Sequence, residues 1–158
     1  MLAIDDERAS AKSRVVALRL TLMTLRLMEN WQRHFRDPET AVLLLAIAAI
    51  NGEKLLREDL EHGRQDLRNP MPVDRLTRCN INSIAVATGI NRETARRKVN
   101  ALADAGIVVR NDDGSVNLRS GLSQQPELIQ LVRMQLETLN RVSNELVRDG
   151  ALKIEVQP

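Results

Sequence analysis

Residues 80–119 read NINSIAVATGINRETARRKVNALADAGIVVRNDDGSVNLR, and this stretch decides the fold. Apolar residues recur at three- and four-residue steps from Ile81, which predicts a short helix with one apolar face. Gly89 follows at a point where a tight turn needs a permissive backbone. Asn91 is a good N-cap for a second helix, and Gly106 is of the residue type that commonly ends helices.

Two runs that favour β-strands follow the second predicted helix. They occupy residues 107–110 and 115–119, and Asn-Asp-Asp-Gly separates them. An Asp-Gly pair between two such runs is a strong hairpin signal. The order helix, glycine turn, helix, hairpin predicts a winged helix-turn-helix.

The second predicted helix, at residues 91–105, has two chemically different faces. Ala95, Val99 and Leu102 are spaced to share an apolar face. Polar residues occupy the rest of its first two turns: Arg92, Glu93, Thr94, Arg96, Arg97, Lys98 and Asn100. Such a surface suits a helix in the DNA major groove, where Arg can bind guanine and Asn can bind adenine. The alternative is an ordinary solvated face, which the independent turn and hairpin signals disfavour.

Residues 91–99, Asn-Arg-Glu-Thr-Ala-Arg-Arg-Lys-Val, resemble the recognition helix of bacterial winged-helix transcriptional regulators. The likeness is greatest to the cyclic-AMP receptor/Fnr class. Residues 102–108 are similar to the segment that leads into the wing of MarR- and GntR-type repressors, and the chain's size and helical flanks are like the MarR type. The resemblance implies that Arg92, Glu93 and Arg97 face bases and that Thr94 binds a phosphate.

The chain also departs from this pattern. Asn91 stands where Ser is usual, and Ala95 stands where Val or Ile is usual. Both residues fit the fold, but neither identifies the DNA sequence that would be read. No glycine-rich β-roll pattern precedes the motif, so the cyclic-nucleotide ligand is not carried over with the resemblance.

Positive charge is concentrated locally. The net charge of the whole chain is only +2, whereas eight cationic and five acidic residues between Asp74 and Arg119 give +3 in that stretch. Local clustering of this kind is typical of DNA-binding proteins. Arg110 and Arg119 lie near the expected wing bases and are predicted to contact phosphates. The acidic wing tip, at residues 112–113, instead favours an alternative: a winged helix that binds another protein.

Composition limits the other possibilities. Trp31 and Phe35 are the only aromatic residues among 158, which favours packed helices and disfavours single-stranded nucleic acid as a ligand. The single cysteine, Cys79, is expected to be a small buried residue, and a redox-sensing thiol is the alternative. No Gly-rich phosphate loop or nucleophile motif is present. We therefore expect no enzyme activity, metal or cofactor.

Three further helices are predicted. Residues 5–35 lack Gly and Pro and read as one long helix, with Val15, Leu18, Leu22 and Leu25 on one of its apolar stripes. Asp37-Pro38 begins the most buried helix, which ends near residues 51–52 or one turn later. Residues 126–149 form the last helix, followed by a loosely held tail at 151–158. A heptad seam is predicted on the last helix: Leu128, Val132, Gln135, Leu139, Val142 and Leu146.

These patterns predict a mostly α-helical protein in three parts: a helical dimerisation region at 1–70, a winged helix-turn-helix at 71–121 and a C-terminal helix at 122–158. The weakly patterned connection at 57–78 is predicted to include a short helix near residues 73–76. We expect a homodimer that binds double-stranded DNA and regulates transcription, and a small-molecule effector in the helical layer is compatible with this function. Because no membrane span or leader pattern is evident, we expect a cytoplasmic protein.

Overall fold

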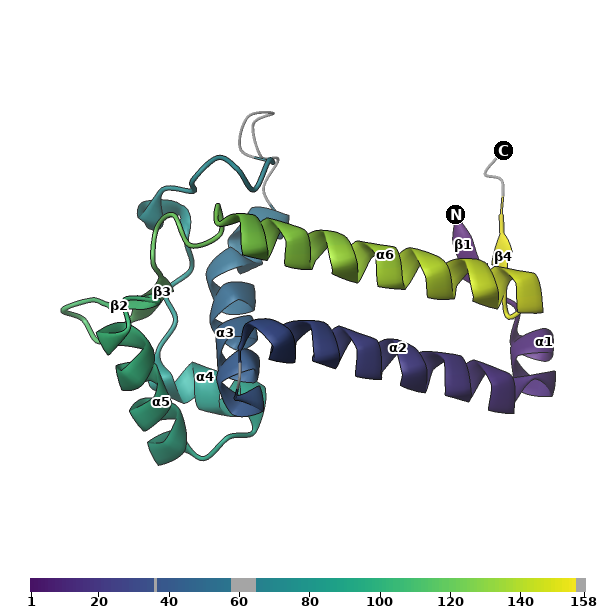
Figure 1. The fold of residues 1–158 in the computed structure, drawn as a ribbon, viewed down its shortest axis with the longest axis horizontal. Coiled ribbons are helices and arrows are strands. Elements are labelled where there is room, and N and C mark those ends of the chain that lie inside the picture. Colours follow the sequence, from purple (N-terminus) through teal and green to yellow (C-terminus); the bar gives the residue numbers. More distant parts are fainter. Residues whose placement is uncertain (36, 58–64, 156–158) are drawn as a thin grey trace. The chain divides into compact units, whose positions relative to one another are not determined.

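The computed structural model describes residues 1–35, 37–57 and 65–155, and the chain is mostly helical (Figure 1). It forms two compact units, one of residues 1–33 with 130–158 and the other of residues 34–129. The prediction of a mostly helical chain with an antiparallel hairpin is confirmed in this form. The units do not follow the predicted boundaries at 70 and 121, because the apolar helix after Asp37 shares a core with the predicted winged module.

The first unit contains β1 (Leu2–Ile4), α1 (Asp6–Ala11), α2 (Ser13–His34), most of α6 (Pro126–Asp149) and β4 (Leu152–Ile154). Helices α2 and α6 run antiparallel side by side (Figure 1). No described helix is long and apolar enough to cross a membrane.

The single helix predicted over residues 5–35 is wrong, because the chain turns at Lys12 and divides it into α1 and α2. The backbone of Lys12 has φ −109° and ψ 22°, outside the helical range. Its ammonium donates to the carbonyl oxygen of Asp149 at 2.8 Å. The turn lets Ala9 on α1 pack against Val142 and Leu146 on α6. Local sequence carries no break signal here, so this tertiary packing is the physical reason for the difference.

The prediction of a loosely held tail at 151–158 is also wrong for residues 152–154. Strand β4 pairs antiparallel with β1, with Leu2 opposite Ile154 and Ile4 opposite Leu152. Gly150, at φ +80°, reverses the chain after α6, and Ala151 is then buried against Val142 and Leu146. Residues 156–158 lie outside the described part of the chain.

Helices α2 and α6 are joined by a small apolar cluster and by one bridging arginine. Val16 and Met23 pack against the cluster around Val142. Arg19 donates to Glu145 and to Asp149, each at 2.5 Å, and it lowers the pKa of the Asp149 carboxyl.

The heptad seam predicted on α6 is divided between two environments. Val142 and Leu146 are buried within the unit, whereas Val132 and Leu139 are each more than half exposed. The four-and-three spacing places these residues along one stripe, but only the C-terminal part of the stripe, at Val142 and Leu146, is buried within the unit.

The second unit is built around α3 (Pro38–Gly52). Five of its residues are buried, more than in any other described helix, which confirms the prediction that it is the most buried. Asp37 accepts a hydrogen bond from the Thr40 amide and caps the helix before Pro38, as predicted. The remaining elements are η1 (Glu53–Leu56), η3 (Val73–Arg75), α4 (Ile81–Thr88), α5 (Arg92–Asp104), β2 (Val108–Arg110) and β3 (Val116–Leu118).

One hydrophobic core runs through this unit. Side chains from α3, α4, α5 and both strands contribute to it: Leu43, Leu44, Ile47, Cys79, Ile84, Ala95, Val99, Leu102, Val108 and Val116. Helix α3 stops at Gly52, the first of the two predicted ends, and the 3-10 helix η1 continues the chain for one further turn, to the second. The short helix predicted near residues 73–76 is η3, while residues 58–64 of the predicted connection lie outside the described part.

Candidate nucleic-acid interface

The turn between α4 and α5 is fixed from both sides. Asn80 and Ser83 form a reciprocal capping box at the start of α4, in which each side chain accepts from the other's backbone amide. Gly89 ends α4 with φ +69°, a left-handed conformation that favours glycine. Asn91 then accepts a hydrogen bond from the Glu93 amide and caps α5. These contacts hold the two helices in a defined helix–turn–helix.

Helix α5 has the two faces that its sequence predicted. Ala95, Val99 and Leu102 are buried in the core. Arg92, Glu93, Arg96 and Arg97 are exposed, and Thr94 and Asn100 are half-buried. The first turns of α5 therefore present a dense group of charged side chains to solvent, while the opposite face of the helix packs in the core.

The exposed arginines of α5 differ in their contacts. Arg96 donates two hydrogen bonds to Glu93, at 3.0 and 2.5 Å, and this bond lowers the pKa of the Glu93 carboxyl. Arg92 and Arg97 form no salt bridge with any residue that the structure describes. An exposed pair such as Glu93–Arg96 contributes about 0–1 kcal/mol, so a ligand could separate it at small cost. All three guanidinium groups are thus available to an anionic partner.

Lys98 is directed away from this group. Its ammonium forms ion pairs with Asp37, the cap of α3, and with Glu39 at 3.2 Å. Only 17% of its side chain is exposed. The hydrogen bond to Asp37 raises the pKa of Lys98, so the pair stays charged at neutral pH. Lys98, predicted to assist binding, instead joins α5 to the start of α3.

Two arginines attach the hairpin to α5 and to the turn that follows it. Arg110 on β2 donates to Asn100 on α5 at 2.7 Å, and Arg119 after β3 donates to the carbonyl of Gly106 at 3.2 Å. Strands β2 and β3 pair antiparallel, with Val109 opposite Asn117. Both arginines remain exposed, so these two cations at the base of the hairpin lie beside the C-terminal end of α5.

Asn51 at the end of α3 holds the other side of the hairpin. Its buried amide nitrogen donates to the carbonyls of Thr77 and Val116, at 2.9 and 3.3 Å, and its oxygen accepts from the Leu118 amide at 3.2 Å. The Cys79 carbonyl accepts from the Val116 amide at 2.6 Å. One side chain therefore fixes β3 to α3 and to the segment before α4. No local pattern indicates this role beyond the position of a polar residue after an apolar run.

The hairpin tip combines acidic groups with one cation. Asp113 accepts from the hydroxyl and the amide of Ser115, which lowers the pKa of its carboxyl, and it also pairs with Arg78 at 2.5 Å. Asp112 is exposed. Arg78, which was not among the predicted contact residues, partly neutralises a tip that would otherwise repel phosphates.

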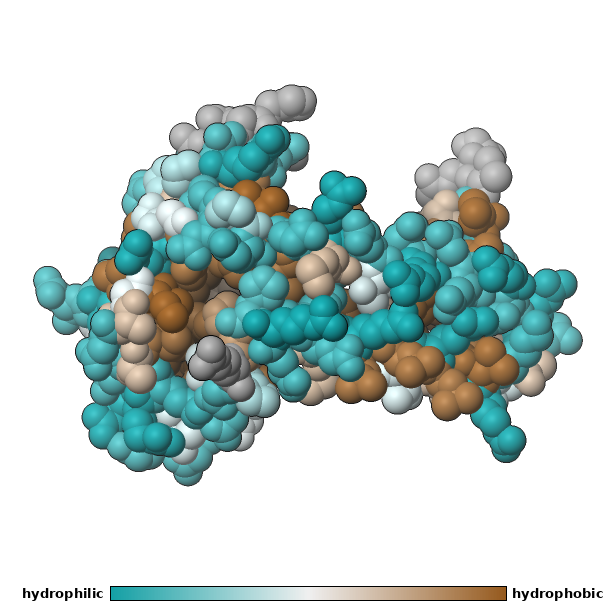
Figure 2. All heavy atoms as spheres, in the orientation of Figure 1, coloured by the Kyte–Doolittle hydropathy of each residue, from teal (hydrophilic) through white to brown (hydrophobic). Residues whose placement is uncertain are grey.

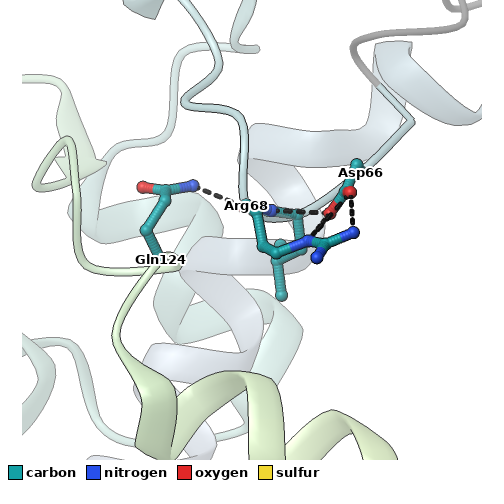
Figure 3. A network of polar contacts seen from close by, with 4 residues as sticks. Asp66, Arg68 and Gln124 are labelled. Atoms are coloured by element: carbon teal, nitrogen blue, oxygen red, sulfur yellow. Dashed lines mark hydrogen bonds and ion pairs between the residues drawn. The ribbon is translucent and has the colours of Figure 1, made fainter.

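A cavity of about 330 Å³ lies between the end of α3, the segment at 65–76 and the segment after β3. Leu55, Leu76 and Leu118 line part of it. Gln124 donates to the carbonyl of Leu67 at 2.6 Å and joins two of the walls (Figure 3). In the same network the Arg68 guanidinium donates from Nε to Oδ1 and from Nη2 to Oδ2 of Asp66, and these bonds lower the pKa of the Asp66 carboxyl.

Two other sequence hypotheses concern reactive groups. Cys79 is fully buried, and burial raises the pKa of its thiol, which disfavours a redox-sensing role. Among the described residues, no three His, Cys, Asp or Glu side chains gather where a metal ion could bind. No protein-family model, curated protein or solved structure matches this chain.

Proposed function

We propose that this protein is a dimeric transcriptional regulator of the winged helix-turn-helix type, which binds double-stranded DNA in a sequence-specific manner. Helix α5 would lie in the major groove, and the β2–β3 hairpin would act as the wing. The observation that carries the proposal is the exposed group of Arg92, Arg96 and Arg97 on a helix whose opposite face is buried. Arginines in this position can form two-pronged bonds to guanine edges.

The other predicted contact residues have graded roles in this proposal. Glu93 would be released from Arg96 and would accept from a base, and Thr94 would bind a phosphate near the start of α5. Asn100 and Arg110 would act as a bonded pair, while Arg119 would contact a phosphate at the wing base. We assign Lys98 a supporting role through Asp37, since that ion pair positions α5. Base contacts would select the sequence and phosphate contacts would fix the register.

The direct test is selection from a pool of random double-stranded DNA at moderate salt, followed by sequencing. A dimer that places two copies of α5 one helical turn apart, about 34 Å, should enrich a palindrome with half-sites roughly ten base pairs apart. Absence of binding even at low salt would contradict the proposal, because several phosphate contacts should give strong binding under those conditions.

Arg97→Ala tests the helix itself. Loss of a two-pronged base contact should cost about 1–3 kcal/mol of DNA-binding free energy and relax the preference at one base position. Arg141→Ala removes the same charge from an exposed site on α6 and is the matched control. Uniform weakening on all sequences would make Arg97 a phosphate contact instead.

A second candidate function is docking of another protein on the same surface. The exposed Asp112 at the hairpin tip favours it, because this carboxylate would repel a DNA backbone. The two functions differ in salt dependence, since DNA binding through several phosphates weakens steeply with salt. If no DNA sequence is enriched and Asp112→Asn does not strengthen weak DNA binding, protein docking becomes the better explanation.

A small-molecule effector remains part of the proposal, but we place it in the cavity within residues 34–129 and no longer in the helical layer. The 330 Å³ cavity is of the size expected for a small ligand, and its walls combine leucines with polar side chains such as Asn51 and Gln124, which suits an amphipathic molecule. A regulator with such an effector would change its DNA affinity when the ligand is added. Titration of small apolar acids and amides during the DNA-binding measurement would test this step.

A further inference from the structure

Within the first unit, the described residues leave one stripe of α2 largely uncovered. Val15, Leu18, Leu22 and Leu25 are 42, 59, 53 and 52% exposed. Their spacing of three, four and three residues places them on one face of the helix. Figure 2 shows apolar side chains at the surface along this helix. Contiguous exposed apolar side chains of this kind mark an interaction surface.

The spacing of this stripe fits a second helix. Residues that alternate three and four apart occupy the a and d positions of a heptad, where the knobs of one helix enter the holes of another. Val15 and Leu22 take a positions, and Leu18 and Leu25 take d positions. The face of α2 that contacts α6 is a different one, since it carries Val16, Arg19 and Met23. The exposed stripe is therefore a second, unused seam.

Charge favours another copy of α2, in the opposite direction, as the second helix. In an antiparallel pair each a residue meets a d residue of the partner, so Leu18 meets Leu22 of the other copy and Val15 meets Leu25. In this register Glu29, the next a position, lies within one turn of Arg14 of the other copy. A parallel pair would instead place Glu29 opposite Glu29, and like charges at such positions are unfavourable.

The flanking positions agree with the antiparallel register. Thr21 would lie near its own counterpart close to the two-fold axis, and Arg14 would lie beside Met28. On the other flank, the charge of Arg19 is already balanced by Glu145 and Asp149 of the same chain. Such an arrangement is self-complementary, as a two-fold symmetric interface requires.

We infer that Val15, Leu18, Leu22 and Leu25 form the seam of an antiparallel α2–α2 pairing between two copies of this chain. This inference rests on the proposed dimeric regulator and identifies its dimer interface. The stripe on α6 that includes Leu136 and Leu139 is exposed as well, but it is not part of this seam.

Cysteine pairs test the direction of the helices in the full chain. Val15→Cys and Leu25→Cys variants, mixed, equilibrated and mildly oxidised, should give a disulfide-linked dimer, because these positions face each other in the antiparallel register. Each variant alone should not link. Buried Cys79 serves as an internal non-reacting thiol. Linking of Val15→Cys to itself would indicate a parallel pair and would overturn the inference, as would the absence of linking in the mixture.

Sedimentation equilibrium tests which stripe holds the dimer. The double variant Leu18→Glu/Leu22→Glu should be monomeric with unchanged helical circular dichroism, because both side chains are exposed in the single chain. The matched control Leu136→Glu/Leu139→Glu makes the same change on α6 and should remain dimeric. Dissociation of the control alone would overturn the inference. So would a wild-type chain that is monomeric at 100 μM, a concentration on the order of 10⁵ times a nanomolar dissociation constant.

A charge reversal provides a readout that loss of folding would not mimic. Arg14→Glu and Glu29→Arg should each raise the dimer dissociation constant by about threefold to tenfold, and the double variant should restore it, since two exposed pairs form per dimer. Additive weakening in the double variant would contradict the register.

DNA selection separates the two proposals. Cross-linking without an enriched DNA sequence would support the α2 seam and contradict the regulator. An enriched palindrome without cross-linking would support the regulator and contradict the α2 seam.

Discussion

The two compact units bury their apolar residues to different extents. In residues 34–129 a core of ten buried residues is shared by three helices and a hairpin. Among the described residues of the unit of residues 1–33 and 130–158, the buried cluster has three members on α6 and just after it, and Val16 and Met23 of α2 pack against it. Several leucines on both helices are more than half exposed. The first core is complete within one chain. The helical pair has apolar surface that a single chain does not cover.

This difference matches the proposed division of work. A DNA-reading helix must be held rigidly, and the core beneath α5 provides that support. A dimerisation element must instead keep apolar side chains available for a partner. Four predictions test the contrast, in order of decreasing effect.

Thiol labelling compares the two units directly. In Leu136→Cys, the new thiol on α6 should react with Ellman's reagent at the rate of a free thiol, because Leu136 is 64% exposed. Cys79 should react at least about 10³ times more slowly, since reaching it requires an opening that costs about 4 kcal/mol or more. Equal rates for the two thiols would show that the core around Cys79 opens easily.

Truncation of core and surface side chains should separate the units in stability. Ile47→Ala removes a fully buried side chain from α3 and should lower the free energy of unfolding by about 2–5 kcal/mol. Leu136→Ala on α6 should change it by less than about 0.5 kcal/mol. Urea denaturation followed by circular dichroism measures both. Similar losses for the two variants would mean that α6 is covered by a partner under those conditions.

Asn51→Ala tests the polar connection between α3 and the hairpin. The change leaves the Val116 carbonyl and the Leu118 amide without their side-chain partner, and it should cost about 1–3 kcal/mol of folding free energy. Asn144→Ala removes a similar amide from the exposed surface of α6 and is the control. An equally small effect of both substitutions would show that water replaces the Asn51 bonds.

Asp37 should give the smallest effect and a distinct pH dependence. Asp37→Ala removes the α3 cap and should cost about 0.5–2 kcal/mol, while Asp37→Asn should retain much of the cap. The hydrogen bonds from Lys98 and then Thr40 lower the pKa of Asp37 from 3.8 to about 2. The carboxylate therefore stabilises the fold above pH 4, and this contribution is lost as pH falls from about 4 to 2. Urea titrations at pH 5, 3 and 2 should show that the free energy of unfolding falls less with decreasing pH for Asp37→Asn than for the wild-type chain.

Local signals in the sequence were sufficient for the helix–turn–helix and the hairpin. The caps Asp37 and Asn91 and the glycines at 89 and 106 act through neighbouring backbone groups, so their roles could be predicted from a few adjacent residues. The hairpin followed from Asp-Gly between two β-favouring runs. These features depend on short-range chemistry that the sequence displays directly.

Contacts between distant residues could not be predicted in this way. Lys98 looks like its neighbours on α5, and its ion pairs with Asp37, 61 positions earlier, and with Glu39 separate it from them. The break at Lys12 and the β1–β4 pairing likewise depend on residues near 150. Periodicity identified the apolar residues of α6, but it could not divide them between an internal contact and an exposed stripe.

The attachment of β3 has a consequence for colloidal behaviour. On the side away from β2, the Val116 amide and carbonyl and the Leu118 amide are already bonded to Cys79 and Asn51. With these three outer backbone groups occupied, β3 is a poor template for the addition of a foreign strand. The opposite edge, on β2, is three residues long and ends in the charged Arg110. Fibril growth from this hairpin is therefore disfavoured at both edges, and any self-association should proceed through helices.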